Sequence, residues 1–161
     1  MIMVTRHNMD PSQTVERFLP HRPPMLLVHR VETADENSAV CVTDVDERLA
    51  LFLGEDERLP VVVLLEIAAQ SIGVWAGHRR PNAESSAPEP GLLLSCRNFH
   101  ATVDSLPIGC AIRSQVQRLI EDGNLGSFAC SLQVGNELVA QVDVTTYQAD
   151  WDTLSAMLTD G

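Results

Sequence analysis

The feature that most constrains the fold is the stretch Pro60–Arg80, PVVVLLEIAAQSIGVWAGHRR. A proline at an opening position and three cationic side chains at the end are typical of the start and the stop of a helix. Within Val61–Gly77 the only polar side chains are Glu66, Gln70 and Ser71. A helix that is apolar almost all round is buried on nearly every side. The rest of the chain is therefore expected to wrap around it.

A stripe of four residues runs along one side of this predicted helix. Glu66, Gln70, Gly73 and Gly77 are four, three and four residues apart, which places them on one face. A buried carboxylate is costly unless it is paired, hydrogen-bonded or protonated. We expect Glu66 to be largely buried, to face a pocket, and to give and take protons there. Two structural alternatives stay open: Glu66 caps a buried polar group, or it faces a water-filled rim.

Length and charge narrow the class of protein. A chain of 161 residues with 45% hydrophobic content predicts one domain over residues 1–161. The net charge of −11 argues against a nucleic-acid partner, because a phosphate binder concentrates cationic charge. The chain contains no Lys, which excludes a Schiff-base lysine and a Walker-type phosphate lysine. A glutamate near the middle of the apolar helix argues against a membrane span, and the start MIMVTRHNMD lacks the apolar stretch of a signal peptide.

The cysteines and histidines show no metal-binding pattern. The four widely spaced cysteines contain no C-x-x-C pair, and we expect each to lie in a strand as a small buried hydrophobe. They favour a reduced, cytoplasmic protein over a disulfide framework or a zinc site. The five histidines show no metal-ligand spacing, so we expect neither a metal nor a cofactor. The cysteines are Cys41, Cys96, Cys110 and Cys130.

Around the central helix the sequence predicts mostly strands. Residues 1–10 are expected to form a loose terminus, and Ser12 to cap a short helix over 15–19. Two strands at 25–31 and 38–45 and a charged linker at 46–59 precede the central helix. The proline-rich stretch at 81–91 is expected to be a flexible, exposed loop. Strands at 92–102, 110–120, 125–134 and 137–148, and a short helix at 150–158, complete an α+β fold with a curved antiparallel sheet around the central helix.

Three segments resemble the 3-hydroxyacyl-(acyl carrier protein) dehydratases. LPHRPPMLLVHRV at 19–31 is similar to the N-terminal signature of that family, and PVVVLLEIAAQ at 60–70 to its central-helix motif. RNFHATVDSLPIGCAIRSQVQ at 97–117 resembles the family's strand, turn and strand. The resemblance covers about residues 15–147. It implies a hotdog fold, a long helix wrapped by an antiparallel sheet, and a dimer with acyl tunnels and active sites at the protomer interface.

The resemblance also implies a reaction and a set of site residues. The reaction is the reversible removal of water from a β-hydroxyacyl thioester carried on the pantetheine arm of acyl carrier protein. The family's helix carboxylate matches Glu66 as the acid/base group, and its helix glutamine matches Gln70 as a supporting hydrogen-bonder. His21 belongs to the N-terminal signature. Pro60 and Val61 are expected to line the substrate pocket together with His21 and Gln70. Backbone N–H groups at the helix start would polarise the thioester carbonyl, because helix N-termini favour negative charge.

One departure separates this chain from the typical dehydratase. The family's catalytic histidine lies in a Gly-His-Phe-Pro-Gly loop before the helix, whereas residues 46–60 of this chain contain no histidine. This pattern is similar to the histidine-poor dehydratase-like subunit of aryl-polyene pigment pathways. That resemblance implies a heterodimer with a sister dehydratase that supplies the histidine. If this chain acted alone, as a homodimer, His21, His29 and His100 would be the substitute bases.

The basic cluster after the helix has two interpretations. His78, Arg79 and Arg80 most simply complement the negative C-terminal end of the helix dipole. They are also the only run of three adjacent basic side chains in an acidic protein, so they could receive an acidic carrier protein.

Three functions remain open at this stage. The first is a dehydratase or dehydratase-like subunit in fatty-acid or polyene-type biosynthesis. The second is a hotdog thioesterase in which Glu66 activates water, and the third is a non-catalytic acyl-binding or structural partner. An enoyl thioester or a free acid as product separates the first two. A serine-nucleophile mechanism is not expected, because no G-x-S-x-G motif is present.

Overall fold

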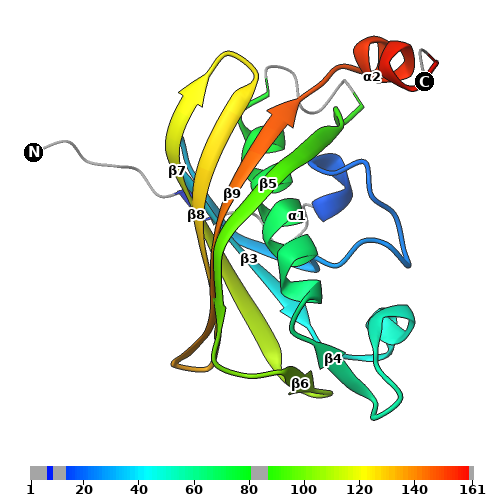
Figure 1. Cartoon of the computed structure of the whole chain (residues 1–161), viewed down its shortest axis with the longest axis vertical. Helices are drawn as coiled ribbons and strands as arrows, with labels where there is room; N and C mark the ends of the chain where they lie inside the picture. The colour runs from blue at the N-terminus through cyan, green and yellow to red at the C-terminus, as the bar shows by residue number, and fades with distance from the viewer. Residues whose placement is uncertain (1–6, 9–13, 81–86, 160–161) are drawn as a thin grey trace, which may run out of the picture.

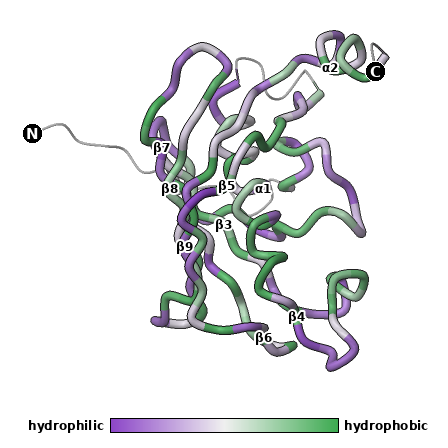
Figure 2. The backbone as a smooth tube through the Cα atoms, viewed as in Figure 1, coloured by the Kyte–Doolittle hydropathy of each residue, from purple (hydrophilic) through white to green (hydrophobic). Residues whose placement is uncertain are grey.

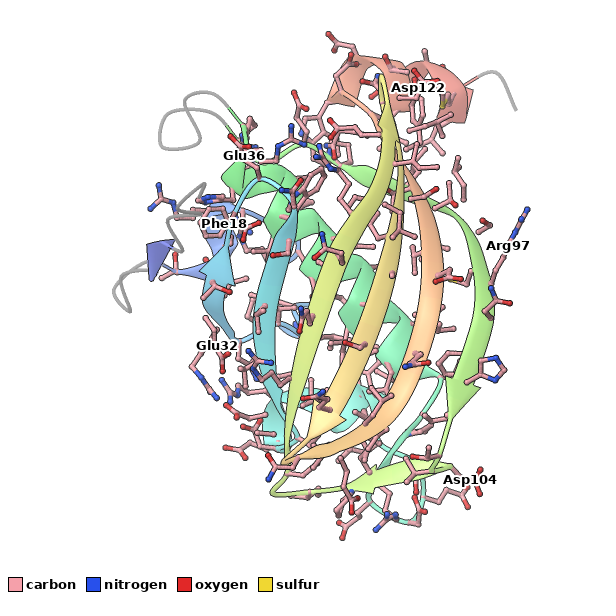
Figure 3. The ribbon with its side chains drawn as sticks, turned by 90° about the vertical axis from the view of Figure 1, so that its left-hand side faces the viewer. Phe18, Glu32, Glu36, Arg97, Asp104 and Asp122 are labelled. Atoms are coloured by element: carbon pink, nitrogen blue, oxygen red, sulfur yellow. The ribbon has the colours of Figure 1, made fainter. Side chains whose placement is uncertain are left out.

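The structure, a computed structural model, describes residues 7–8, 14–80 and 87–159 (Figure 1). Seven strands form one antiparallel sheet in the order β1-β2-β3-β7-β8-β9-β5, and the short strands β4 and β6 pair separately. The helix α1 lies across one face of the large sheet (Figures 1 and 3). In chain order the elements are β1 (His7–Asn8), η1 (Val15–Arg17), β2 (Arg30–Ala34), β3 (Ser38–Asp44), η2 (Glu47–Phe52), β4 (Arg58–Pro60), α1 (Val63–His78), β5 (Gly91–Ala101), β6 (Ser105–Pro107), β7 (Ala111–Asp122), β8 (Leu125–Val134), β9 (Glu137–Gln148) and α2 (Trp151–Thr159); η1 and η2 are 3₁₀ helices.

The four long strands after residue 90 follow their sequence pattern to within two residues of the predicted bounds. Gly123 and Gly135 have φ angles of 58° and 60° and occupy the tight turns of the β7–β8 and β8–β9 hairpins. Glycine adopts this left-handed conformation without steric penalty. Along β9, Val142 and Val144 are buried whereas Asp143 between them is partly exposed, as a half-buried strand requires. The predicted α+β architecture is confirmed.

The sheet-facing side of α1 forms the centre of the core. Leu64 and Ile67 are fully buried together with Ile112 of β7 and Phe128 of β8. Figure 2 shows hydrophobic residues dominating the tube of α1. The sheet covers only one side, however, and Val62 at the start of the helix is 60% exposed. The expectation of a helix buried on nearly every side is therefore wrong for its first turn.

Residues 14–29, the N-terminal segment, cover a second side of α1. Phe18 and Leu19 are buried against the helix at the two glycines of the predicted stripe. A Cβ added at Gly77 would lie 2.6 Å from the Phe18 carbonyl oxygen, and one at Gly73 would lie 2.5 Å from Leu19 Cδ2. Glycine is thus required at position 77, where the backbone of this segment approaches the helix closely, whereas the neighbour of Gly73 is a side chain.

Some local predictions are wrong for identifiable reasons. The strand predicted at 25–31 begins only at Arg30, because the N–H groups of Leu27 and Val28 donate to the Gln70 side chain instead of a neighbouring strand. The predicted linker at 46–59 contains η2, whose first turn is capped by Asp46, and most of β4, which pairs with β6.

The structure describes only part of the predicted N-terminal tail at 1–10 and of the predicted loop at 81–91. Residues His7–Asn8 form a short strand that pairs with β2. Gly91 is the first residue of β5 and does not belong to the loop predicted at 81–91. The remainder of 1–10, the Ser12 cap and residues 81–86 lie outside the described residues. In the described part of the chain, no helix is long and apolar enough to cross a bilayer.

Candidate active site

A groove of about 420 Å³ lies between α1 and the ends of β5, β8 and β9. Glu66 and His21 line one end, and Arg79 and Glu121 line the other. Thirteen residues of helix separate Glu66 from Arg79, which corresponds to about 20 Å at 1.5 Å per residue. Between these polar ends the wall is largely apolar and includes Ile72, Trp75, Phe128 and Leu93. An elongated apolar chain with a polar group at one end is the kind of ligand that such a groove accommodates.

Glu66 projects from the first turn of α1, where the helix dipole favours negative charge. Its Oε1 accepts a hydrogen bond from Gln70 Nε2 at 3.0 Å and lies 3.6 Å from His21 Nε2. The Glu66 side chain is 46% exposed, so the prediction that it is largely buried is wrong for the single chain. The sheet covers the opposite side of this turn, which leaves the carboxylate at a solvent-facing rim. This was one of the two alternatives that the sequence left open.

Gln70 connects the N-terminal segment to this carboxylate. It is only 1% exposed, and its Oε1 accepts the N–H groups of Leu27 at 2.8 Å and Val28 at 3.3 Å. Its Nε2 donates to the Met25 carbonyl oxygen at 2.9 Å and to Glu66. Because the oxygen faces two donors and the nitrogen two acceptors, the amide orientation is determined. The supporting role that the resemblance implies for Gln70 thus has a geometric basis.

At Pro60 and Val61 the helix start provides no backbone N–H group that is available to a thioester carbonyl. Pro60 ends β4 and Val61 precedes the helix, and neither residue is among those that line the groove. The N–H of Val61 already donates to the Asp104 carbonyl oxygen at 2.9 Å. This amide is therefore occupied and does not polarise a thioester carbonyl in the observed conformation.

The basic cluster at the helix end makes local contacts. The Arg79 guanidinium lies 4.5 Å from the centre of the Trp75 ring and pairs with Glu121 at 2.7 Å. Hydrogen bonds from Arg118 and Arg79 lower the pKa of the Glu121 carboxyl. Arg80 donates to the Ala87 carbonyl oxygen at 2.8 Å. The docking of a carrier protein at this cluster remains a prediction.

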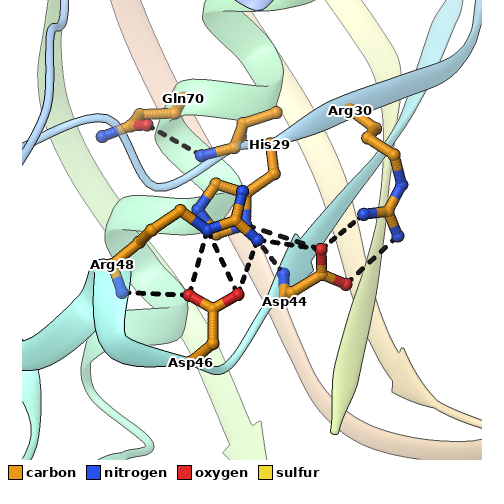
Figure 4. A network of polar contacts seen from close by, with 7 residues as sticks. His29, Arg30, Asp44, Asp46, Arg48 and Gln70 are labelled. Carbon is orange, nitrogen blue, oxygen red and sulfur yellow. Dashed lines mark hydrogen bonds and ion pairs between the residues drawn. The ribbon is translucent and has the colours of Figure 1, made fainter. Parts of the chain in front are cut away.

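A polar network that the sequence did not indicate holds η2, in the region where the related dehydratases carry their histidine (Figure 4). Asp44 binds both Arg30 and Arg48, and Asp46 accepts hydrogen bonds from the backbone N–H and the side chain of Arg48. The bonds from Arg48 lower the pKa of Asp46 to about 2. The acidic residues at 44, 46 and 47, followed by Arg48, are the only signal that could have suggested this network, and a local cluster of charges does not specify partners.

His29 belongs to the same network. Its Nδ1 accepts the N–H of Asp44 at 2.9 Å, and its side chain is 6% exposed. Burial, followed by the positive charge of Arg48, lowers the pKa of His29. His29 is therefore a structural residue just before β2, and its inward position removes it from the groove. Cys41, Cys96 and Cys130 lie in strands as predicted, whereas Cys110 lies one residue before β7; all four thiols are free.

The architecture and the site together define a class. A long helix wrapped by an antiparallel sheet, with a helix carboxylate at one end of an elongated apolar groove, is a hotdog protein of the dehydratase type. The family model "ApeP-like: ApeP dehydratase" matches residues 13–159. The chain belongs to the ApeP-like dehydratase family.

Known relatives agree with this assignment. A chain of the dehydratase heterocomplex ApeI:P from Xenorhabdus doucetiae is 30% identical, with a TM-score of 0.83 over 91% of this chain and 97% of that chain. The 3-hydroxyacyl-[acyl-carrier-protein] dehydratase FabZ of Sinorhizobium fredii is 29% identical over 82% of this chain and 85% of its own length. A hypothetical thioesterase with coenzyme A from Streptococcus pneumoniae, 11% identical with a TM-score of 0.56 over 75% of this chain and 85% of that chain, shares the fold alone.

Proposed function

We propose that this chain is the carboxylate-bearing subunit of a heterodimeric dehydratase that acts on 3-hydroxyacyl thioesters of acyl carrier protein. In the elimination, a base takes the proton from Cα and its electrons form the Cα–Cβ double bond. The hydroxyl leaves Cβ with a proton from an acid, giving an enoyl thioester and water. Glu66 donates the proton to the departing hydroxyl, and a histidine of the partner subunit takes the Cα proton. The cytoplasm is the proposed setting, which suits four free thiols.

Two observations together carry this proposal: Glu66 is exposed, and the stretch before the helix contains no histidine. The carboxylate lies at the rim of the groove, and residues 46–60 contain no histidine that could act as the base. Val62, one helical turn before Glu66, is 60% exposed, and Met25, whose carbonyl binds Gln70, is 52% exposed. Apolar side chains around a functional carboxylate suit a surface that a partner subunit covers.

The free edge of the sheet supports a dimer. β5 is the last strand of the large sheet, and it is 11 residues long. Leu93 and Leu94 on this strand are 45% and 54% exposed, and Arg97 extends outward from the strand (Figure 3). A long apolar edge strand is a template for pairing with another chain. Because β5 also lines the groove, a partner on this edge would lie next to the site.

The test compares dehydration rates for three samples: this chain alone, a histidine-bearing sister dehydratase alone, and their mixture. We expect weak or no turnover by this chain alone, and an increase in the mixture beyond the sum of the two. Removal of one member of an acid/base pair commonly costs about 10²–10⁴-fold, so the difference is measurable. Strong turnover by this chain alone would overturn the proposal.

The same assay separates the alternatives. A thioesterase would release a free acid from the acyl thioester, and no enoyl thioester would accumulate. A non-catalytic partner would leave the rate of the sister dehydratase unchanged, while binding of an acyl-pantetheine mimic would separate an acyl-binding role from a purely structural one.

A further inference from the structure

His21 lies at the same end of the groove as Glu66 and has an unusual environment. Its Nε2 is 3.6 Å from Glu66 Oε1, whereas its Nδ1 is buried and has no hydrogen-bond partner among the described residues. The backbone beside it is fixed, because Arg22 Nη1 donates to the carbonyl oxygens of Leu19 and His21, each at 2.8 Å. The segment thus fixes the point from which the His21 side chain projects toward Glu66.

The buried Nδ1 decides where the imidazole carries its proton. In the neutral ring, a proton on Nδ1 would bury an N–H group without a partner, which is costly. The tautomer that avoids this cost carries its proton on Nε2. This N–H faces the Glu66 carboxylate. The 3.6 Å separation exceeds a normal hydrogen bond, as is common for catalytic contacts before a ligand is bound.

We infer that His21 is a positioning residue that, together with Gln70, anchors Oε1 of Glu66 and leaves Oε2 as the atom that carries the transferable proton. Both neighbours present N–H donors to Oε1, and a donor cannot take up a proton from the carboxyl group. A protonated Glu66 therefore holds its proton on Oε2. This inference rests on the proposed function, in which Glu66 delivers a proton to the departing hydroxyl.

The first test uses two substitutions of His21 in the mixture with the sister dehydratase. His21→Gln keeps a side-chain N–H donor near the position of Nε2, whereas His21→Asn is too short to reach Glu66. We expect His21→Asn to lower kcat about tenfold or more with KM changed by less than about twofold, and His21→Gln to restore most of the rate. Equal rates for the two variants would overturn the inference. Thermal unfolding of both variants checks that they fold.

The second test does not depend on turnover. In ¹⁵N-histidine-labelled protein, the ring nitrogens of His21 should show the tautomer with the proton on Nε2, and Glu66→Gln should shift the Nε2 signal. Glu89→Gln, an exposed acidic residue at the distant end of the groove, should not shift it. A proton on Nδ1, or an Nε2 signal unaffected by Glu66→Gln, would refute the role of His21. If the wild-type mixture fails to dehydrate while these spectral results hold, the proposed function fails and the anchoring of Glu66 stands.

Discussion

At the scale of single residues, the site depends on a carboxylate that is exposed and yet held in one orientation. Buried catalytic carboxylates are oriented by their surroundings. Glu66 instead depends on Gln70, which is itself fixed by four hydrogen bonds, three of them to the backbone of the N-terminal segment. A side chain that is fixed in this way loses little conformational entropy when substrate binds.

Glu66→Gln should reduce dehydration by the mixed proteins about 10²–10⁴-fold, because the amide cannot deliver a proton. The free energy of unfolding should change by less than about 0.5 kcal/mol, since the side chain is at the surface and its oxygen still accepts the Gln70 N–H. Rate assays and denaturant unfolding measure the two effects. Glu137→Gln, at an exposed position outside the groove, serves as the control. Persistence of the wild-type rate in Glu66→Gln would remove Glu66 from the mechanism.

His29 should make stability depend on pH. Its ordinary pKa of 6.5 applies to the unfolded chain, and burial lowers the pKa in the fold. The imidazole is neutral in both states above 6.5, so stability is full there. As the pH falls below 6.5, the unfolded chain takes up a proton that the fold resists, and the free energy of unfolding decreases.

His29→Asn should remove most of this decrease, because an amide oxygen can still accept the Asp44 N–H but does not titrate. Denaturant unfolding at several values between roughly pH 7.5 and 5 measures it. His100→Asn, at an exposed position, is the matched control and should leave the decrease in place. An unchanged profile for His29→Asn would assign the decrease to other groups.

At the scale of elements, α1 is shaped by two different neighbours. The side of α1 that faces the sheet carries large apolar side chains. The side that contacts the N-terminal segment carries glycines at the points of contact. The same segment carries His21 to the groove. Packing of this segment against α1 therefore determines the geometry of the site.

Gly77→Ala should destabilise the fold by about 1–2 kcal/mol, although alanine favours a helix by about 1 kcal/mol, because the new Cβ would meet the backbone of Phe18. Gly73→Ala should cost less, since the nearest atom there is the end of the Leu19 side chain, which can move. Denaturant unfolding of the two variants gives the comparison. A larger loss for Gly73→Ala would contradict the assignment of the less adaptable contact to Gly77.

The end of α1 carries the predicted carrier-docking cluster. If the docking prediction is right, Arg80→Ser should raise KM about tenfold for a substrate on acyl carrier protein, and leave KM unchanged for the same acyl group on free pantetheine. Arg113→Ser, at an exposed arginine on β7, controls for the loss of one positive charge. Equal effects on both substrates would indicate that Arg80 acts only on the fold.

At the scale of the whole molecule, the free edge of β5 and the exposed apolar surface near Glu66 both predict that the chain associates with another subunit. Sedimentation should show a dimer at micromolar concentration, and mixing with the sister dehydratase should give a heterodimer. Leu94→Lys should weaken association about tenfold or more, because it places a charge on the pairing edge. Ile120→Lys, near the tip of the β7–β8 hairpin, is the control. A monomeric wild-type chain would contradict this assembly.

The sequence alone was sufficient for the architecture and for the choice of Glu66 as the candidate catalytic residue. The long apolar run, the two turn glycines and the strand alternation are local signals, since each reflects a backbone or burial preference of a few neighbouring residues. The two family-like motifs, at 19–31 and 60–70, identified Glu66 and Gln70 in advance. The order of elements followed from the same local signals.

Only the tertiary structure decided what these residues contact. The exposure of Glu66, the approach of His21, and the network around His29 and Asp44 depend on segments up to about 45 residues apart in the chain. Periodicity cannot show which side of a helix remains uncovered, because coverage is a property of everything packed around it. The prediction of a buried Glu66 failed for this reason: the residues of α1 specify an apolar helix, and the rest of the fold determines which of its turns reaches water.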